Sequence, residues 1–134
     1  MKRKTALITG ATSGIGEACA RRFANGGYNL IITGRTADKL ETLKAEFEAL
    51  GVDVLALAFD VCDREATRQA VASIPESFKP IDVLINNAGL ARGLEPEYEG
   101  SFQDWDEMID TNIKGLLNMT RLVVPQMVSL NHGH

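Results

Sequence analysis

Three glycines in one short stretch could cradle a phosphate group. The stretch follows an apolar run and consists of Thr9-Gly10-Ala11-Thr12-Ser13-Gly14-Ile15-Gly16. Gly10 permits a tight turn, Gly14 lets phosphates approach the backbone, and Gly16 lets a helix pack closely on a sheet. A helix N-terminus adds free N–H groups, and the hydroxyls of Thr12 and Ser13 add donors. The stretch predicts a pyrophosphate site, although its G-x-x-x-G-x-G spacing is not the commoner one. A purely structural turn is the alternative.

An arginine follows the second apolar run. In dinucleotide-binding folds an acid at this point binds the ribose hydroxyls of NAD, whereas an arginine accommodates the 2′-phosphate of NADP. The chain has Gly34-Arg35-Thr36 here and no acid before Asp38. Because a guanidinium can pair with phosphate and stack on adenine, we expect NADP(H) at Arg35. A solvated loop arginine is the alternative. Binding of S-adenosylmethionine is less favoured, because that ligand would need an acid here to accept hydrogen bonds from its ribose hydroxyls.

The third apolar run ends in Asp60-Val61. Asp60 could accept a hydrogen bond from an adenine amino group, or it could cap a helix, as Asp63 also could. Nothing basic adjoins Cys62 in the sequence, so we expect an inert thiol there. We expect His132 and His134 to be solvated tail residues rather than ligands, and we expect no metal site.

These residues need a framework of alternating strands and helices. Apolar runs predict strands at 5–9, 28–33, 52–59 and 81–85, and helical spacing predicts helices at 14–25, at 36–50, after Asp63 and after Ser101. This order predicts an α/β fold, a Rossmann-like doubly wound parallel sheet. Its first helix would bury Ile15, Ala18, Cys19 and Phe23. Its last would bury Leu116, Leu117, Thr120, Val124 and Met127, with Pro125 kinking or interrupting it.

Composition limits the alternatives. The 134 residues (14.6 kDa) suit one domain over 1–134, and a net charge of −4 disfavours a strongly basic nucleic-acid binder. Residues 1–40 carry seven basic and two acidic side chains, which leaves a small polyanion possible near the first third. Two cysteines make no disulfide framework, and no targeting or membrane segment is evident. We expect a cytoplasmic protein without a membrane partner.

Taken together, the motifs resemble one family. Along its whole chain the sequence resembles the short-chain dehydrogenases/reductases. The resemblance lies in T-G-A-T-S-G-I-G at 9–16, Arg35, Asp60, N-N-A-G at 86–89 and Asn112. Residues 86–134 further resemble the NADP-dependent 3-hydroxy acid dehydrogenase group, which includes serine and allo-threonine dehydrogenases.

The resemblance implies a role for each matching residue. Asn112 would be catalytic, helping to hold the water of a proton relay, although from its position alone it would be an ordinary helix residue. Asn86 would brace the sheet. The implied cofactor-binding residues are Gly10, Thr12, Ser13, Gly14, Ile15, Gly16, Arg35, Thr36, Asp60, Val61, Asn87, Ala88 and Gly89.

One part of the family pattern does not occur in the chain. The family uses a Ser and a Tyr-x-x-x-Lys, whose Lys lowers the pKa of the Tyr that moves the hydroxyl proton. Ile32 stands four residues after Tyr28, and Phe102 stands four after Tyr98. We therefore expect the cofactor half of the domain, truncated after the fourth strand and the following helices, to be inactive alone.

Three functions remain open at this point. The first is an NADP-dependent oxidoreductase acting on a small hydroxy acid or its carbonyl counterpart. The second is a non-catalytic NADP(H)-binding module or fragment. The third is another nucleotide-binding Rossmann domain, which N-N-A-G disfavours.

Association is also expected from the sequence. The resemblance places the strand at 81–85 beside a fifth strand that the chain lacks, so one apolar edge would be open to pairing with another chain. The final helix would add an exposed apolar face. We expect a homo-oligomer, the alternative being that helix 112–130 folds over the edge.

Overall fold

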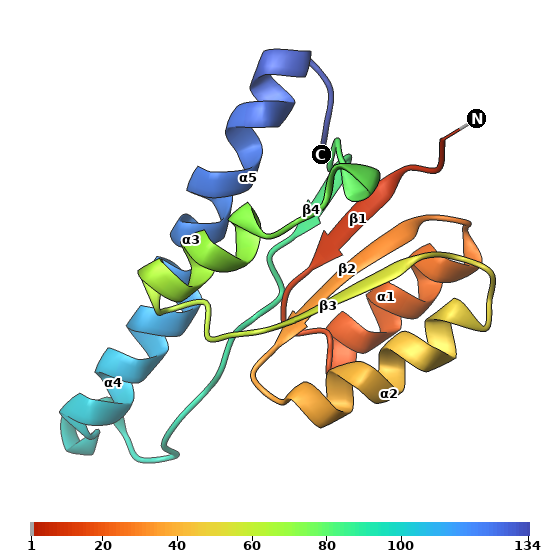
Figure 1. Cartoon of the computed structure of the whole chain (residues 1–134). Coiled ribbons are helices and arrows are strands. Elements are labelled where there is room, and N and C mark those ends of the chain that lie inside the picture. The colour runs from red at the N-terminus through yellow and green to blue at the C-terminus, as the bar shows by residue number, and fades with distance from the viewer. Residues whose placement is uncertain (1) are drawn as a thin grey trace.

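Four parallel strands form one sheet with helices on both faces (Figure 1). A computed structural model describes residues 2–134. The strands are β1 (Thr5–Ile8), β2 (Asn29–Gly34), β3 (Val54–Ala58) and β4 (Val83–Ile85), in the spatial order β3-β2-β1-β4. All three pairings are parallel. The predicted Rossmann-like α/β sheet is therefore confirmed, with strand ends shifted by one or two residues.

The helices divide between the two faces of the sheet. α1 (Gly14–Asn25) and α2 (Ala37–Glu48) cover one face, and α3 (Arg64–Ala72) and α5 (Leu116–Leu130) cover the other (Figure 1). α4 (Phe102–Ile109) continues through a π-helical turn, Asp110–Gly115, into α5. Two short 3₁₀ turns lie at Glu76–Phe78 and Glu97–Glu99.

The sheet separates two apolar cores. Successive side chains of a strand point to opposite faces. Ile8 and Ile32 accordingly join the core under α1 and α2, whereas Leu7 and Ile31 join the core under α5. Every position of β1 and β2 is buried, which explains why both strands are apolar without alternation.

The buried face of α1 differs from the prediction. Ile15 is 76% exposed, and the residues that face the sheet are Gly16, Ala20 and Ala24. These small residues recur every four positions, so the helix backbone can approach the sheet closely. The prediction followed the larger apolar side chains and therefore placed Ile15 and Ala18 on the wrong face.

The buried face of α5 also differs from the prediction. Leu116 and Leu117 are 42% and 57% exposed, and the buried residues are Asn118, Met119, Val123 and Met127. The Asn118 side chain donates to the Val61 carbonyl at 2.9 Å, so a polar residue occupies the inner face with its hydrogen bond made.

Pro125 does not interrupt α5, which runs unbroken to Leu130. The carbonyl that loses its partner to a proline at this position belongs to Arg121. Both Pro125 and Arg121 are exposed, so water can satisfy that carbonyl. The departure from regular α-helix comes earlier, in the π-helical turn Asp110–Gly115.

The outer edge of β4 is partly covered by the last residues of the chain. His134 N donates to the Asp82 carbonyl at 2.9 Å, and Leu84 N donates to the His134 carbonyl at 2.8 Å, the pattern of a parallel strand pair. The His132 ring lies 3.1 Å from an Asp82 carboxylate oxygen. Both histidine side chains are exposed, as expected, but these contacts correct the expectation that the edge is wholly open. The covering segment is the tail, not α5.

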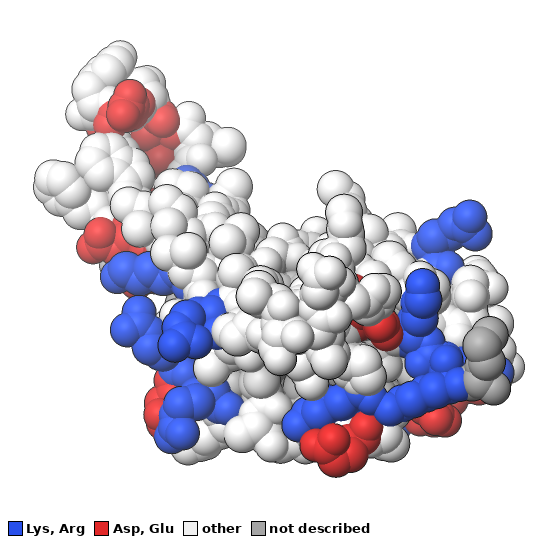
Figure 2. Space-filling model, turned by 90° about the horizontal axis from the view of Figure 1, so that it is seen from above, with Lys and Arg blue, Asp and Glu red and all other residues white. Residues whose placement is uncertain are grey.

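Charge is unevenly distributed over the surface. Acidic side chains gather on the projecting lobe, while basic side chains form one group below this lobe and another on the opposite side of the molecule (Figure 2). Between Arg92 and Lys114 the sequence holds seven acidic residues and no basic one. The lobe therefore repels anions, and an anionic ligand is favoured elsewhere.

Candidate cofactor site

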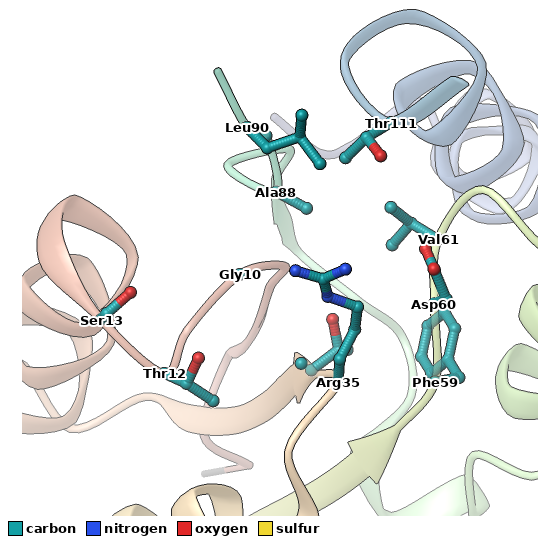
Figure 3. A pocket seen from close by; sticks show the side chains of 13 residues that line it. Gly10, Thr12, Ser13, Arg35, Phe59, Asp60, Val61, Ala88, Leu90 and Thr111 are labelled. Carbon is teal, nitrogen blue, oxygen red and sulfur yellow. The ribbon is translucent and has the colours of Figure 1, made fainter. Parts of the chain in front are cut away.

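A cleft of about 170 Å³ lies where the four strands end (Figure 3). In open α/β sheets, ligands bind beyond the carboxyl ends of the strands, where the strand order reverses. Here the reversal falls between β1 and β4. The cleft is lined by Gly10, Thr12, Ser13, Thr33, Gly34, Arg35, Phe59, Asp60, Val61, Ala88, Gly89, Leu90 and Thr111.

The three glycines of the turn after β1 differ in the space around them. Gly10 has φ +62°, and a Cβ there would lie 2.9 Å from the Ala88 Cα. A Cβ on Gly16 would lie 2.1 Å from the Gly10 carbonyl oxygen, so Gly16 packs α1 against the turn. Gly14 has φ +56° and nothing within 4 Å of the place of a Cβ. Gly14 does not line the cleft, and this open space lies along the outer side of α1.

Two helix N-termini at this end of the sheet have no side-chain cap. Ser13 and Thr36 are the N-cap residues of α1 and α2, and neither makes a capping hydrogen bond. Asp63 and Ser101, by contrast, cap α3 and α4 by accepting from backbone N–H groups. The first N–H groups of α1 and α2 therefore remain free to bind an anion.

Arg35 extends from the end of β2 into the middle of the cleft (Figure 3). Its side chain is exposed, and within residues 2–134 no carboxylate lies at ion-pair distance from its guanidinium. The planar group is free to bind a phosphate through two N–H groups. Thr36 is also exposed but does not line the cleft.

The segment 86–89 fastens the end of β4 to its neighbours. The Thr9 hydroxyl accepts from the backbone N–H of Asn87 at 3.0 Å and of Ala88 at 2.9 Å. The Asn87 side chain donates to the Gly10 carbonyl at 3.0 Å, so it holds the glycine turn and does not face the cleft. The Asn86 side chain donates to the Thr120 hydroxyl on α5 at 3.1 Å.

Asn112 holds the chain that follows β4. Its side chain donates to the Leu90 carbonyl and accepts from the Leu90 N–H, each at 2.8 Å. A Cβ on Gly89 would lie 3.0 Å from the Asn112 carbonyl oxygen, so a larger residue would crowd this pair. Both polar atoms of the side chain are engaged with one residue. Each of these two atoms can make one more hydrogen bond.

Asp60 and Val61 line the cleft opposite the glycine turn, beside Thr111 (Figure 3). One carboxylate oxygen of Asp60 accepts from the backbone N–H of Cys62 at 3.1 Å and from its thiol at 3.0 Å. Burial raises the pKa of the Cys62 thiol, the hydrogen bond to Asp60 raises it further, and the Thr111 hydroxyl opposes the rise. The thiol is therefore protonated at neutral pH, and Asp63, not Asp60, caps α3.

The cleft contains some predicted residues and omits others. Gly14, Ile15, Gly16, Thr36, Asn87 and Asn112 do not line it. Five further residues line the cleft that were not predicted from the sequence: Thr33, Gly34, Phe59, Leu90 and Thr111. All but Thr33 directly adjoin a predicted residue in the chain, which is a usable signal. Thr111 precedes Asn112, and the π-helical turn brings Thr111 over the cleft.

The chain belongs to the short-chain dehydrogenase family, whose family model matches residues 4–134. It is 52% identical over 128 residues to an NADP-dependent 3-hydroxy acid dehydrogenase, YdfG, of Salmonella typhi, covering 96% of this chain and 50% of that protein. It is 50% identical over 124 residues to a serine 3-dehydrogenase of Agrobacterium fabrum, covering 92% and 49%.

A solved structure agrees with this assignment. The closed form of a serine dehydrogenase in complex with NADP⁺ superposes with a TM-score of 0.91 at 48% identity, covering 97% of this chain and 51% of that one. The chain thus spans about half the length of the curated relatives that it matches. None of the helices in residues 2–134 has the length and apolar character that a bilayer crossing requires.

Proposed function

We propose that this chain provides the cofactor-binding half of an NADP-dependent oxidoreductase. The enzyme would exchange a hydride between NADP(H) and a small hydroxy acid, such as serine or another 3-hydroxy acid. The relatives named above support the substrate class. Support from this chain's own geometry comes from Arg35, an unpaired guanidinium in a cleft at the carboxyl ends of the strands.

The residues around the cleft fit a dinucleotide phosphate. At the uncapped start of α1, which Gly14 begins, the pyrophosphate would bind to backbone N–H groups. Arg35 and the uncapped start of α2 would hold the 2′-phosphate, with Thr36 beside them. Asp60 and Val61 would contact adenine, and Ala88 and Gly89 would line the way to the nicotinamide. The bound nicotinamide would supply the hydride acceptor or donor.

Four predicted residues take supporting parts in this proposal. Gly16 and Asn87 hold the glycine turn in shape, and Ile15 flanks it from outside. Asn112 fixes the position of Leu90 at the mouth of the cleft, and it would help to hold the water of a proton relay.

The alternative function is a non-catalytic NADP(H)-binding module. It is favoured by one observation, that neither tyrosine in the chain is followed by lysine four residues later. Without that pair no side chain in the sequence matches the family's proton donor. We therefore expect no turnover of NADP⁺ with serine or 3-hydroxyisobutyrate by the 134-residue chain alone.

The setting and assembly of the protein belong to the same proposal. The two cysteines are free thiols, which suits a cytoplasmic protein. Exposed apolar side chains along α4 and α5 favour a homo-oligomer. Neither nucleic acid nor membrane is a proposed partner.

The cofactor choice is tested by replacing Arg35. A hydrogen bond to a charged group contributes about 1.5–3 kcal/mol, so Arg35→Ala should weaken NADP(H) binding about 10- to 150-fold and leave NAD(H) binding nearly unchanged. Titration calorimetry on the parent and the variant measures both. Arg22→Ala removes an exposed arginine in the last turn of α1 that does not line the cleft, so this matched control should change neither affinity. Equal affinity of the parent for NAD(H) and NADP(H) would contradict the proposal.

A further inference from the structure

We propose that Cys62 is a positioning residue for the cofactor: its thiol and backbone N–H occupy one oxygen of Asp60 and leave the other oxygen for the adenine amino group. This inference rests on the proposed function, since it takes adenine to bind beside Asp60. Neither the family resemblance nor the spacing of motifs assigns Cys62 a role.

Cys62 donates two hydrogen bonds to one oxygen of the Asp60 carboxylate. A carboxylate oxygen has two lone pairs, and Oδ1 of Asp60 accepts two hydrogen bonds from Cys62, from N–H at 3.1 Å and from Sγ at 3.0 Å. Within residues 2–134 no cation forms an ion pair with Asp60. The two donors of Cys62 therefore set the rotation of this carboxylate without neutralising it.

The hydrogen bond from Sγ requires that the Cys62 thiol is protonated. A thiolate 3.0 Å from a carboxylate would place two negative charges together, so the contact requires S–H. Burial and the neighbouring Asp60 raise the pKa of Cys62, and Asp110 adds to the rise. The thiol therefore remains a hydrogen-bond donor at neutral pH.

Asp60 and Cys62 lie at the wall of the cleft where adenine is proposed to bind. Asp60, Val61 and Thr111 line the cleft, and Cys62, which follows Val61 in the chain, contacts the Asp60 carboxylate through its thiol. Figure 3 shows Asp60 and Val61 on the same wall, beneath Thr111. Loss of the thiol would free the carboxylate to rotate, and this would affect a ligand that binds through its adenine amino group.

The first experiment measures the pair without any cofactor. In a Cys19→Ser background only Cys62 can react, and its alkylation by iodoacetamide at pH 8 follows the fraction of thiolate. Asp60→Asn removes the charge that disfavours the thiolate, so the rate should rise several-fold. Asp53→Asn, an exposed carboxylate before β3, is the control and should leave the rate unchanged. An unchanged rate in Asp60→Asn would overturn the proposal.

The second experiment measures the effect on adenine. Adenosine 2′,5′-bisphosphate carries the amino group, and inosine 2′,5′-bisphosphate has a carbonyl oxygen in its place. Cys62→Ala should weaken binding of the adenosine compound about 3- to 10-fold and leave binding of the inosine compound unchanged. Cys62→Ser keeps a donor and should restore most of the affinity. These ratios separate positioning from general destabilisation, which would weaken both compounds.

The outcomes are distinguishable from failure of the proposed function. Equal losses for the two nucleotides, or no loss in Cys62→Ala, would overturn the positioning role while leaving the cofactor site in place. Failure of the parent chain to bind adenosine 2′,5′-bisphosphate would overturn the proposed function and with it the adenine role of Cys62. The alkylation rates would then still show whether the thiol and the carboxylate are paired.

Discussion

The layer of α1 and α2 and the layer of α3 and α5 differ in how much apolar surface the chain itself buries. Under α1 and α2 the core is closed, with Phe47, Ile8 and Ile32 fully buried. On the other side, large apolar side chains of α5 and of the adjoining α4 reach solvent. The closed layer is the one that carries Arg35 and the glycine turn. The core on the side of α1 and α2 is thus closed by residues of this chain, whereas α4 and α5 leave apolar surface exposed.

The largest expected effect tests the closed layer directly. Phe47 is fully buried on α2, and the Arg21 guanidinium lies 5.3 Å from its ring centre. Phe47→Ala should lower the free energy of unfolding by about 3–5 kcal/mol, because it leaves a cavity in a closed core.

The matched control for Phe47 lies in the open layer. Phe102 on α4 is 79% exposed and touches Trp105 edge to face at 5.4 Å. Phe102→Ala should cost less than about 1 kcal/mol. Urea unfolding of both variants measures the difference, and equal losses would show that the two layers do not differ as described.

The next largest effect concerns the glycine turn. A Cβ on Gly16 would lie 2.1 Å from the Gly10 carbonyl, and backbone must shift to admit it. Gly16→Ala should cost about 1–3 kcal/mol and abolish nucleotide binding, because the shift deforms the phosphate site.

Gly14→Ala is the comparison at the same turn. The space there is open, so the cost comes only from its φ of +56° and should be about 1 kcal/mol. Thermal unfolding and calorimetry on the two variants would test the order of the losses. A greater loss of stability in Gly14→Ala would mean that strain, not close packing, dominates at this turn.

The sequence predicts the features that depend on local chemistry better than those that depend on packing between distant segments. Continuous apolar runs and the glycines at strand ends predict β1, β2, the turn and Arg35, because each depends on local chemistry. The predicted buried faces of α1 and α5 were right for Phe23, Val124 and Met127. The rest were wrong because small residues and a hydrogen-bonded Asn118 pack inside, and no apolar periodicity shows this. Thr111 reaches the cleft through a π-helical turn, and His134 pairs with β4 through backbone groups. Neither arrangement has a side-chain pattern.

A substitution among the exposed apolar residues of α4 and α5 should have the smallest effect on the free energy of unfolding. Its effect on the association of copies should be large. Ile109, Ile113 and Leu117 are spaced by four residues through α4 and α5 and are 45%, 55% and 57% exposed. An apolar stripe of this kind favours association, so the 14.6 kDa chain should sediment as a multimer at micromolar concentration. Leu117→Asp places a charge in the stripe, and burial of an unpaired charge opposes association strongly. The free energy of unfolding of the monomer should change by less than about 0.5 kcal/mol, since the position is exposed.

A control with the same change of charge isolates the stripe. Leu94 is fully exposed in the loop before α4, so Leu94→Asp adds the same charge away from the stripe and should leave the multimer intact. Sedimentation equilibrium on the parent and both variants measures the mass of each. If the parent sediments as a monomer with a cooperative thermal transition, the prediction of a multimer is wrong. The tail paired with β4 would then be enough to protect that edge in a stable monomer. If both variants dissociate, net charge and not the stripe governs assembly. Dissociation of Leu117→Asp alone would locate the contact between copies on α4 and α5, on the layer that the chain does not close by itself.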